Sequence, residues 1–379
     1  TSFDVILPRV GKFYITGIYS GDDYYRGSRN ITSCEVTKRD TPISISNKEC
    51  AIGNVYAKYL NGKDNEDSFH FFSKSFTLIA SRSKSYEDGT ILSNNGNSIN
   101  KQLLKGLLYY YSIATSFPKI SKVSIIRKRA KSADFNYTLD CANIIQPIIP
   151  DNDNPYSFNK EVLKEIFNES ERGDAYRIAL SYWLKGIASS ERYYKFDHFW
   201  RAFNRLYLYH ANTEKDFDGM KHMRQCIIDN PRMFPLTLRM INSYTPIDLR
   251  KFRWRSLILN DYDTFKKTAA FKDFVLRYND ERIMNLFKDV LPYREEYLKN
   301  ANLYNDVVSH INQAPIRKDC ELITLLSIKY AYFVRNKIFH GEIPDSTFKI
   351  HDDYIDDEID NLNGILSTSS IFLYFLPHN

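Results

Sequence analysis

The residues best suited to chemistry lie near the end of the chain, in an Arg-Asn-Lys-Ile-Phe-His run at 335–340. A histidine transfers protons near neutral pH, and an arginine holds phosphate through a planar fork of donors. These groups suit RNA cleavage, in which the 2′-hydroxyl attacks its own phosphodiester. The reaction needs a base for the hydroxyl proton and a cation for the added negative charge. We therefore expect Arg335, Asn336 and His340 to be catalytic, with no metal and no cofactor.

The spacing of these residues constrains how they can act together. An apolar run with helical spacing leads into them, and Gly341 follows. On a helix, Asn336 and His340 are four residues apart and share a face. Arg335 and His340 are five apart, which puts them about 140° apart around the axis. They converge on one phosphate only if the helix loosens near Gly341, or if a second copy supplies the complementary group.

The spacing by itself is not specific. Arg192 with His198 and Arg205 with His210 also fit a loose R-x(4–6)-H pattern. Neither arginine is followed by a polar residue, and both pairs fall in an aromatic-rich helix whose solvated side would hold them. For residues 335–340 the plain alternative is a helix C-terminus, where cations and glycine are favoured. That alternative explains the arginine and the glycine, but not the combination with asparagine and histidine.

This run resembles the R-(N/D/H)-x-x-x-H signature of the HEPN superfamily, which includes toxin, CRISPR-associated and phage-defence ribonucleases. The segment 196–207, rich in Phe, Trp and Tyr, resembles the aromatic core helix near the start of such domains. The resemblance covers residues 155–379, with large insertions, and does not extend to residues 1–150. It implies an all-helical bundle and a homodimer whose two motifs form one composite active site. It also implies a toxin or antiviral role, with a neutralising or activating protein as a further partner.

The composition is that of a protein with two or three cores. The chain has 379 residues, of which 43% are hydrophobic and 26% charged, and its net charge of +6 permits nucleic acid without demanding it. Five widely spaced cysteines argue against a disulfide framework or a zinc knuckle. The first residues contain no basic region followed by an apolar core, so we expect no signal peptide. The apolar segment at 371–376 is too short to span a bilayer. We expect a cytoplasmic protein with no membrane partner.

The pattern along the chain indicates an α+β protein. Residues 1–150 hold nine of the fourteen glycines and read as a β-rich domain with one helix. The expected strands are 3–10, 12–19, 55–60, 69–79, 123–127 and 135–139, and the helix is 100–115. A Pro-, Asp- and Asn-rich boundary at 147–155 precedes a helical domain at 151–379. Its later helices are expected at 261–278, 281–299, 318–339 and 354–375.

Basic residues outside the catalytic run are candidate RNA contacts. One group flanks a predicted strand, and another alternates with Phe252 and Trp254, as suits single-stranded nucleic acid. With the lysine of the catalytic run, these candidates are Lys337, Arg127, Lys128, Arg129, Arg250, Lys251, Arg253 and Arg255. The aromatic stripe around Trp200 is expected to be core rather than a surface for bases.

Three hypotheses remain at this point. The first is a metal-independent endoribonuclease of the HEPN type, with residues 1–150 sensing a trigger, binding a partner or restraining the nuclease. The second is a non-catalytic HEPN-like module that dimerises or binds RNA or nucleotides. The third places the main activity in residues 1–150. The sequence contains no phosphate-binding loop, nucleophile elbow or HExxH motif that would favour another enzyme class.

Overall fold

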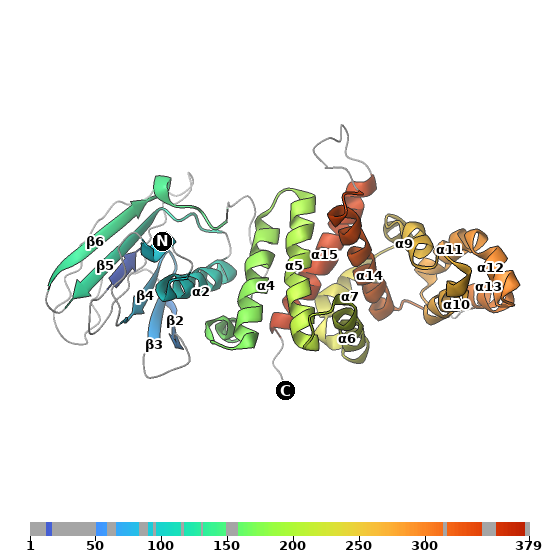
Figure 1. Cartoon of the computed structure of the whole chain (residues 1–379), viewed down its shortest axis with the longest axis horizontal. Coiled ribbons are helices and arrows are strands. Elements are labelled where there is room, and N and C mark those ends of the chain that lie inside the picture. The colour runs from blue at the N-terminus through green and yellow to red at the C-terminus, as the bar shows by residue number, and fades with distance from the viewer. Residues whose placement is uncertain are drawn as a thin grey trace. The chain divides into compact units, whose positions relative to one another are not determined.

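The computed structural model describes residues 13–16, 51–58, 66–82, 90–93, 96–114, 117–129, 132–148, 158–313, 317–342 and 354–375. It divides into two compact units, Thr1–Ala188 and Ser189–Asn379 (Figure 1). The predicted boundary at 147–155 lies mostly outside the described residues, and the structure divides the chain later, after Ala188. The helices just after that segment belong to the first unit. The expected α+β class is confirmed at this level, with one antiparallel sheet and many helices.

The first unit is built on a six-stranded antiparallel sheet in the order β2-β3-β4-β1-β5-β6. The strands are β1 (Phe13–Thr16), β2 (Ala51–Lys58), β3 (Glu66–Phe72), β4 (Phe76–Ala80), β5 (Lys122–Arg129) and β6 (Ser132–Asp140). The prediction of one strand at 69–79 was wrong. The polar Ser-Lys-Ser segment at 73–75 forms a tight turn, closed by a 2.8 Å bond from the Phe72 amide to the Ser75 carbonyl, so the segment is a hairpin. The expected strand at 3–10 lies outside the described residues.

One face of the sheet is covered by helix α2 (Ser98–Ile113), close to the helix expected at 100–115. Alternate residues of β3 and β4 are buried, as the two-residue period of a strand requires. Phe76 contacts Tyr110 of the helix, with 5.8 Å between ring centroids. Gly106 allows this approach, because a Cβ there would lie 2.6 Å from the Phe76 ring. A further short helix, α1 (Thr90–Ser93), precedes α2.

The chain after residue 158 completes this core. It forms α3 (Lys160–Leu163), the 3₁₀ helix η2 (Lys164–Phe167) and α4 (Glu171–Ala188). Phe167 packs edge-on against Phe69, with 4.8 Å between ring centroids. The buried Lys105 of α2 donates to the Phe167 carbonyl at 3.2 Å and to Glu169 at 2.5 Å. These contacts explain why the segment belongs with the sheet.

The second unit is helical throughout its described residues. Its α-helices are α5 (Arg192–Ala211), α6 (Asp216–Asp229), α7 (Pro235–Ser243), α8 (Pro246–Arg250), α9 (Trp254–Asp261), α10 (Thr268–Arg277), α11 (Glu281–Val290), α12 (Glu295–Asn300), α13 (Tyr304–Gln313), α14 (Cys320–Phe339) and α15 (Tyr354–Phe375). In Figure 1, α5, α15, α14 and α7 lie side by side, and α5 also packs on α6. The expected helix at 354–375 is confirmed, and that at 318–339 begins two residues late.

The aromatic stripe of α5 lies in the core, as predicted. Its members Phe196, Phe199, Trp200, Phe203, Leu206 and Tyr207 are all buried. Trp200 reaches Tyr332 of α14, with 5.8 Å between the ring centroids. The stripe therefore joins the first helix of this unit to the helix that carries the candidate catalytic run.

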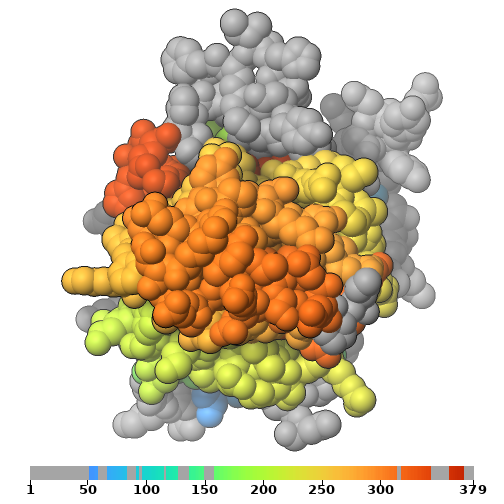
Figure 2. Space-filling view, turned by 90° about the vertical axis from the view of Figure 1, so that its right-hand side faces the viewer, coloured from blue at the N-terminus to red at the C-terminus, as the bar shows by residue number. Residues whose placement is uncertain are grey.

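Helices α8 to α13 form a second cluster within this unit, and the orange residues of α10 to α13 gather on one face in Figure 2. The two long helices expected at 261–278 and 281–299 are both shorter than predicted. In the first, the 3₁₀ turn η4 (Phe265–Lys267) takes the place of the expected first turns, so α10 begins only at Thr268. The second stops at η5 (Leu291–Tyr293), where Pro292 lacks the amide that an α-helix needs.

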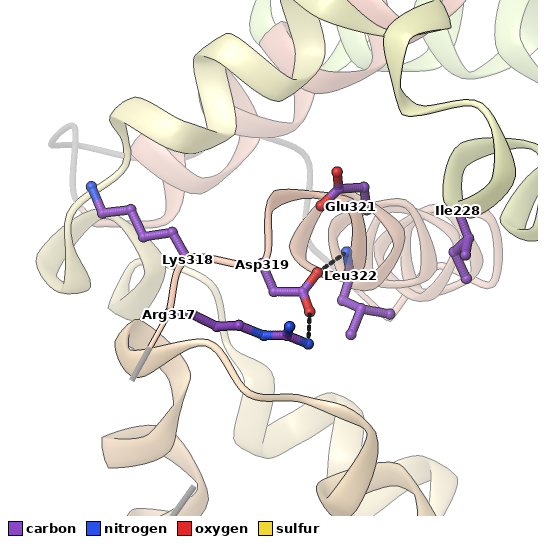
Figure 3. A pocket seen from close by; sticks show the side chains of 6 residues that line it. All are labelled: Ile228, Arg317, Lys318, Asp319, Glu321 and Leu322. Carbon is purple, nitrogen blue, oxygen red and sulfur yellow. Dashed lines mark hydrogen bonds and ion pairs between the residues drawn. The ribbon is translucent and has the colours of Figure 1, made fainter. Parts of the chain in front are cut away.

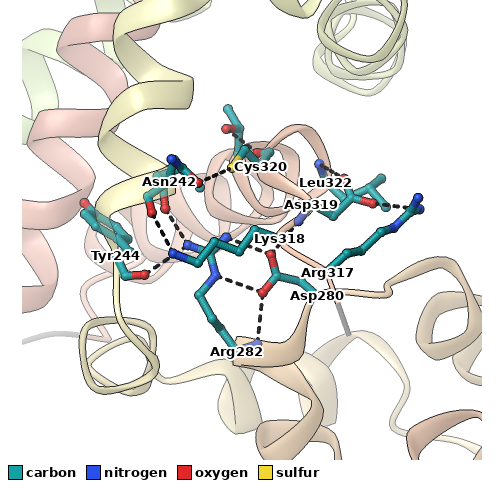
Figure 4. Close-up of polar contacts among 11 residues, drawn as sticks. Asn242, Tyr244, Asp280, Arg282, Arg317, Lys318, Asp319, Cys320 and Leu322 are labelled. Carbon is teal, nitrogen blue, oxygen red and sulfur yellow. Dashed lines mark hydrogen bonds and ion pairs between the residues drawn. The ribbon is translucent and has the colours of Figure 1, made fainter. Parts of the chain in front are cut away.

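A buried ion pair lies where this cluster joins the bundle (Figure 4). The Asp280 and Arg282 side chains are 0% and 1% exposed and 2.7 Å apart. Arg282 also donates to the Ile241 and Tyr244 carbonyls at the end of α7, at 2.6 and 3.0 Å. Asp280 accepts the Asp319 amide at 2.8 Å, just before α14. This ion pair thus attaches both ends of the α8–α13 cluster to the bundle, one at the end of α7 and the other just before α14.

Among the helices that the structure describes, none combines the length and the apolar character needed to cross a bilayer.

Candidate active site

The candidate catalytic run occupies the last turn of α14, and a buried carboxylate fixes this helix one and a half turns earlier. Glu358 of α15 is fully buried and accepts a hydrogen bond from the Tyr330 hydroxyl. The Nε of Arg253 donates to the other Glu358 oxygen at 3.1 Å, and the Arg253 amide donates to Tyr330. Burial raises the pKa of Glu358, and Arg253 opposes that rise. The helix is therefore held against both α15 and the start of α9.

The end of α14 is closed by its own backbone. His340 is the C-cap residue, and Gly341 has φ +69°, in the left-handed region. The Glu342 amide donates to the Lys337 carbonyl at 2.9 Å, and the Gly341 amide donates to the Ile338 carbonyl at 3.1 Å. This is the Schellman pattern, which satisfies carbonyls that a helix end otherwise leaves free. The backbone under His340 is therefore well defined.

Arg335 is oriented by two neighbours on its own helix. Its Nη1 donates to Asn336 Oδ1 at 2.9 Å. Its guanidinium carbon lies 4.6 Å from the centroid of the Phe339 ring, one turn further along. The structure thus brings Arg335 and Asn336 together, a contact that the spacing of Asn336 with His340 did not predict. The contact of Arg335 with Phe339 was not predicted either.

His340 lies apart from that pair. It is exposed, and α14 runs without interruption from Arg335 to Phe339. The local break that would let Arg335 and His340 converge within one chain is therefore not present in α14. With the helix intact, the two side chains stay about 140° apart around the axis.

Lys337 is engaged in a contact of its own. Its ammonium lies 2.5 Å from Glu342 Oε2 and 5.6 Å from the centroid of the Phe333 ring. A phosphate would have to compete with Glu342 for this cation. Lys337 is therefore a weaker candidate for RNA contact than the sequence alone suggested.

The basic cluster at 250–255 is only partly arranged as expected. Phe252 and Trp254 are buried, so neither can stack on a base, and that part of the prediction was wrong. Arg253 pairs with Glu358, and Lys251 lies 3.9 Å from Asp248. Arg250 is exposed, and the Arg255 guanidinium carbon lies 3.8 Å above the exposed Tyr293 ring.

The other basic group lies in the first unit. Arg127, Lys128 and Arg129 fall at the end of β5, which pairs with β6 and shifts register between Arg127 and Arg129. Their side chains are outside what the structure describes. Their role as RNA contacts stays a prediction.

An open pocket of about 340 Å³ lies at the other end of α14 (Figure 3). Two cations, two carboxylates and two aliphatic side chains line it, namely Ile228, Arg317, Lys318, Asp319, Glu321 and Leu322. Asp319 caps α14 and bonds the Leu322 amide at 3.3 Å, so part of the lining is structural. The 20 residues of α14 put this pocket roughly 30 Å from His340. It has no histidine or cysteine and is not the candidate catalytic site.

Within the described ranges, no group of three or more His, Cys, Asp or Glu side chains is placed to hold a metal ion. No family model matches the chain, and comparisons with curated proteins and with solved structures give no significant match. Any functional argument therefore depends on the chemistry of the residues themselves.

Two residues at this helix end were missed from sequence. Phe339 received no role in the sequence analysis, yet it is 69% exposed and contacts Arg335. Its helical position was the available signal, because residues four apart share a face and Phe339 follows Arg335 by four. Glu358 carried no such signal, since its partners lie on α14 and before α9, far away in sequence.

We predict that Gly341→Ala lowers the free energy of unfolding by about 1 kcal/mol, because an L-residue at φ +69° is strained. A Cβ here would have no atom within 4 Å, so the cost is conformational rather than steric. Gly341→Asn should cost less, since asparagine tolerates this region better. Urea unfolding followed by circular dichroism measures both. Equal stability of all three proteins would contradict the assignment of the cap.

Proposed function

We propose that the second unit is an endoribonuclease of the HEPN type that cleaves RNA without a metal ion. One observation carries the proposal: Arg335, already oriented by Asn336, shares the end of a capped helix with an exposed His340. A guanidinium and an imidazole are the two groups that 2′-hydroxyl attack requires.

The arrangement of helices is compatible with that class. The aromatic helix α5 begins the unit, α14 carries the run, and α15 packs against both of them. Helices α8 to α13, the second cluster, then stand as a large insertion between the two halves of a bundle. This likeness rests on helix order and packing, and it supports the proposal without identifying a family.

In the proposed reaction, the Nε2 or Nδ1 atom of His340 takes the proton of the 2′-hydroxyl. The 2′-oxygen forms a bond to phosphorus, and the bond from phosphorus to the 5′-oxygen breaks. The 5′-oxygen takes a proton from water, and the hydroxide so formed takes the proton from the His340 imidazolium, which restores the base. The products are a 2′,3′-cyclic phosphate and a 5′-hydroxyl. Arg335 binds the phosphate oxygens, whose negative charge grows in the transition state.

We further propose that the active form is a homodimer, because the intact end of α14 holds Arg335 and His340 about 140° apart around the helix axis. Arg335 of one copy would then act with His340 of the other. The first unit would sense a trigger, bind a neutralising or activating protein, or restrain the nuclease. A toxin or antiviral role is consistent with this plan, and RNA is the proposed substrate in either role.

The test is cleavage of mixed RNA by purified protein in EDTA. We expect fragments with 2′,3′-cyclic phosphate ends, and no cleavage of an oligonucleotide whose 2′-hydroxyls are replaced by hydrogen. His340→Ala should abolish the activity, while His222→Ala, which removes an exposed histidine of α6, should retain it. Toxicity on expression, relieved by His340→Ala, covers the case of a missing activator. Intact RNA together with no toxicity favours the second candidate, a non-catalytic module that dimerises or binds RNA.

A further inference from the structure

Phe339 is the anomaly of this helix end. Its side chain is 69% exposed, although burying a phenylalanine is worth about 1.5–3 kcal/mol. It stands directly before the capped end, where backbone hydrogen bonds define the path of the chain. An exposed aromatic ring held on a rigid backbone needs a reason.

The surroundings of the ring are polar and cationic. Relative to Arg335, the helical rotation of 100° per residue places Phe339 at about 40°, Asn336 at about 100° and His340 at about 140°. The buried Tyr330 and Val334 fall on the opposite half of the helix. Phe339 therefore projects from the same outward half as the candidate catalytic side chains.

The ring also holds the arginine. A guanidinium 4.6 Å from the ring centroid is within the range of a cation–π contact. Together with the bond to Asn336, this contact fixes the plane of the Arg335 guanidinium. Because 69% of the side chain is still exposed with Arg335 in place, room for a second flat group remains.

We propose that Phe339 is the residue on which a nucleobase next to the scissile phosphate stacks, so that the substrate is unpaired RNA. This inference rests on the proposed function. Bases of single strands stack on aromatic rings, whereas bases in a duplex are already stacked and paired. The phosphate attached to such a base would lie beside Arg335, whose cation is oriented at the same ring.

The charge around the ring fits a nucleotide. The carbonyls of Asn336, Lys337 and Ile338 all accept backbone amides, so they do not face an incoming phosphate as free acceptors. Glu342, a nearby carboxylate, is bound to Lys337. Of the described residues, Arg335 contacts the ring, and Asn336 and His340 project from the same outward half of the helix. A protein interface would instead need an extended apolar area around the ring. We therefore commit to a base as the occupant.

The test measures binding rather than cleavage. A single-stranded RNA with 2′-O-methyl groups cannot be cut, and its dissociation constant is followed by fluorescence anisotropy. Phe339→Ala should weaken binding by roughly 5- to 150-fold, the range for loss of one stacked base. Phe217→Ala, which removes another exposed ring, on α6, is the matched control and should bind as the wild type does.

Two further variants separate stacking from loss of structure. Phe339→Trp should keep the affinity, and RNA binding should quench the fluorescence of the introduced indole. The three native tryptophans are buried, so this quenching can be assigned to position 339. An abasic site in the RNA should weaken binding to the wild type but not to Phe339→Ala. Duplex RNA should bind equally to both proteins.

Two results would overturn the proposal. One is wild-type affinity of Phe339→Ala for the single strand. The other is dissociation of a dimer in Phe339→Ala, with equal loss of affinity for single and double strands, which would make the ring an interface between copies. Phe339-dependent binding without any cleavage by the wild type would refute the proposed nuclease alone.

Discussion

Arg335→Ala and His340→Ala, each inactive alone, are expected to restore about a quarter of wild-type RNA cleavage when they are co-expressed with different tags. Each variant alone should lose on the order of 10³-fold in rate, the scale of a lost proton-transfer group or phosphate clamp. Half of randomly formed dimers contain one copy of each variant. In such a dimer, one of the two composite sites has both Arg335 and His340. A quarter of all sites in the mixture are therefore intact.

The reason is the unbroken end of α14. Because helix geometry holds Arg335 and His340 about 140° apart, the proposed site pairs Arg335 of one copy with His340 of the other. The control is a chain that carries both substitutions, mixed in equal amount with the wild type. Shared sites leave about a quarter of the activity in that mixture, whereas sites within one chain leave about half. No recovery in the first mixture and half activity in the second would show that each chain acts alone.

The parts of the fold with a strong periodic signal were predictable from sequence. Helix α15 at 354–375 and helix α2, expected at 100–115, follow from apolar spacing alone. The aromatic stripe of α5 was correctly assigned to the core. The misses occurred where local chemistry interrupts a period. The 69–79 run is a hairpin because of three polar residues, and Pro292 divides a helix that otherwise reads as continuous.

The candidate site was chosen by residue type, and its geometry could not be predicted from the sequence. Residue types pointed to Arg335, Asn336 and His340, and Gly341 correctly predicted a helix end. The contact of Arg335 with Phe339 depends on rotamers, which a sequence does not specify. The burial of Phe252 and Trp254 depends on Tyr330, 76 or more residues away, and no local pattern signals such a contact.

The buried pair beneath the helical cluster gives the largest expected effect on stability. Asp280→Ala should lower the free energy of unfolding by about 3–5 kcal/mol, because it leaves the Arg282 charge buried without its partner. It also removes the side chain that caps α11, through a 2.9 Å bond to the Arg282 amide. Urea unfolding measures the loss. Asp197→Ala, which breaks an exposed pair with Arg201, should change stability by less than about 1 kcal/mol.

The effect of Asp280→Ala should depend on pH in a defined direction. Burial by itself would raise the pKa of Asp280, but hydrogen bonds from the Arg282 side chain and from the Arg282 and Asp319 amides outweigh it, and the pKa lies below the ordinary 3.8. A carboxyl whose pKa is lower in the folded state stabilises the protein above its unfolded pKa. That stabilisation is lost as the pH falls through the folded value. The difference between wild type and Asp280→Ala should therefore be constant near neutral pH and shrink below pH 3.8. A difference that grows on acidification would mean that Asp280 is protonated in the folded protein, and that Arg282 is held by the Ile241 and Tyr244 carbonyls alone.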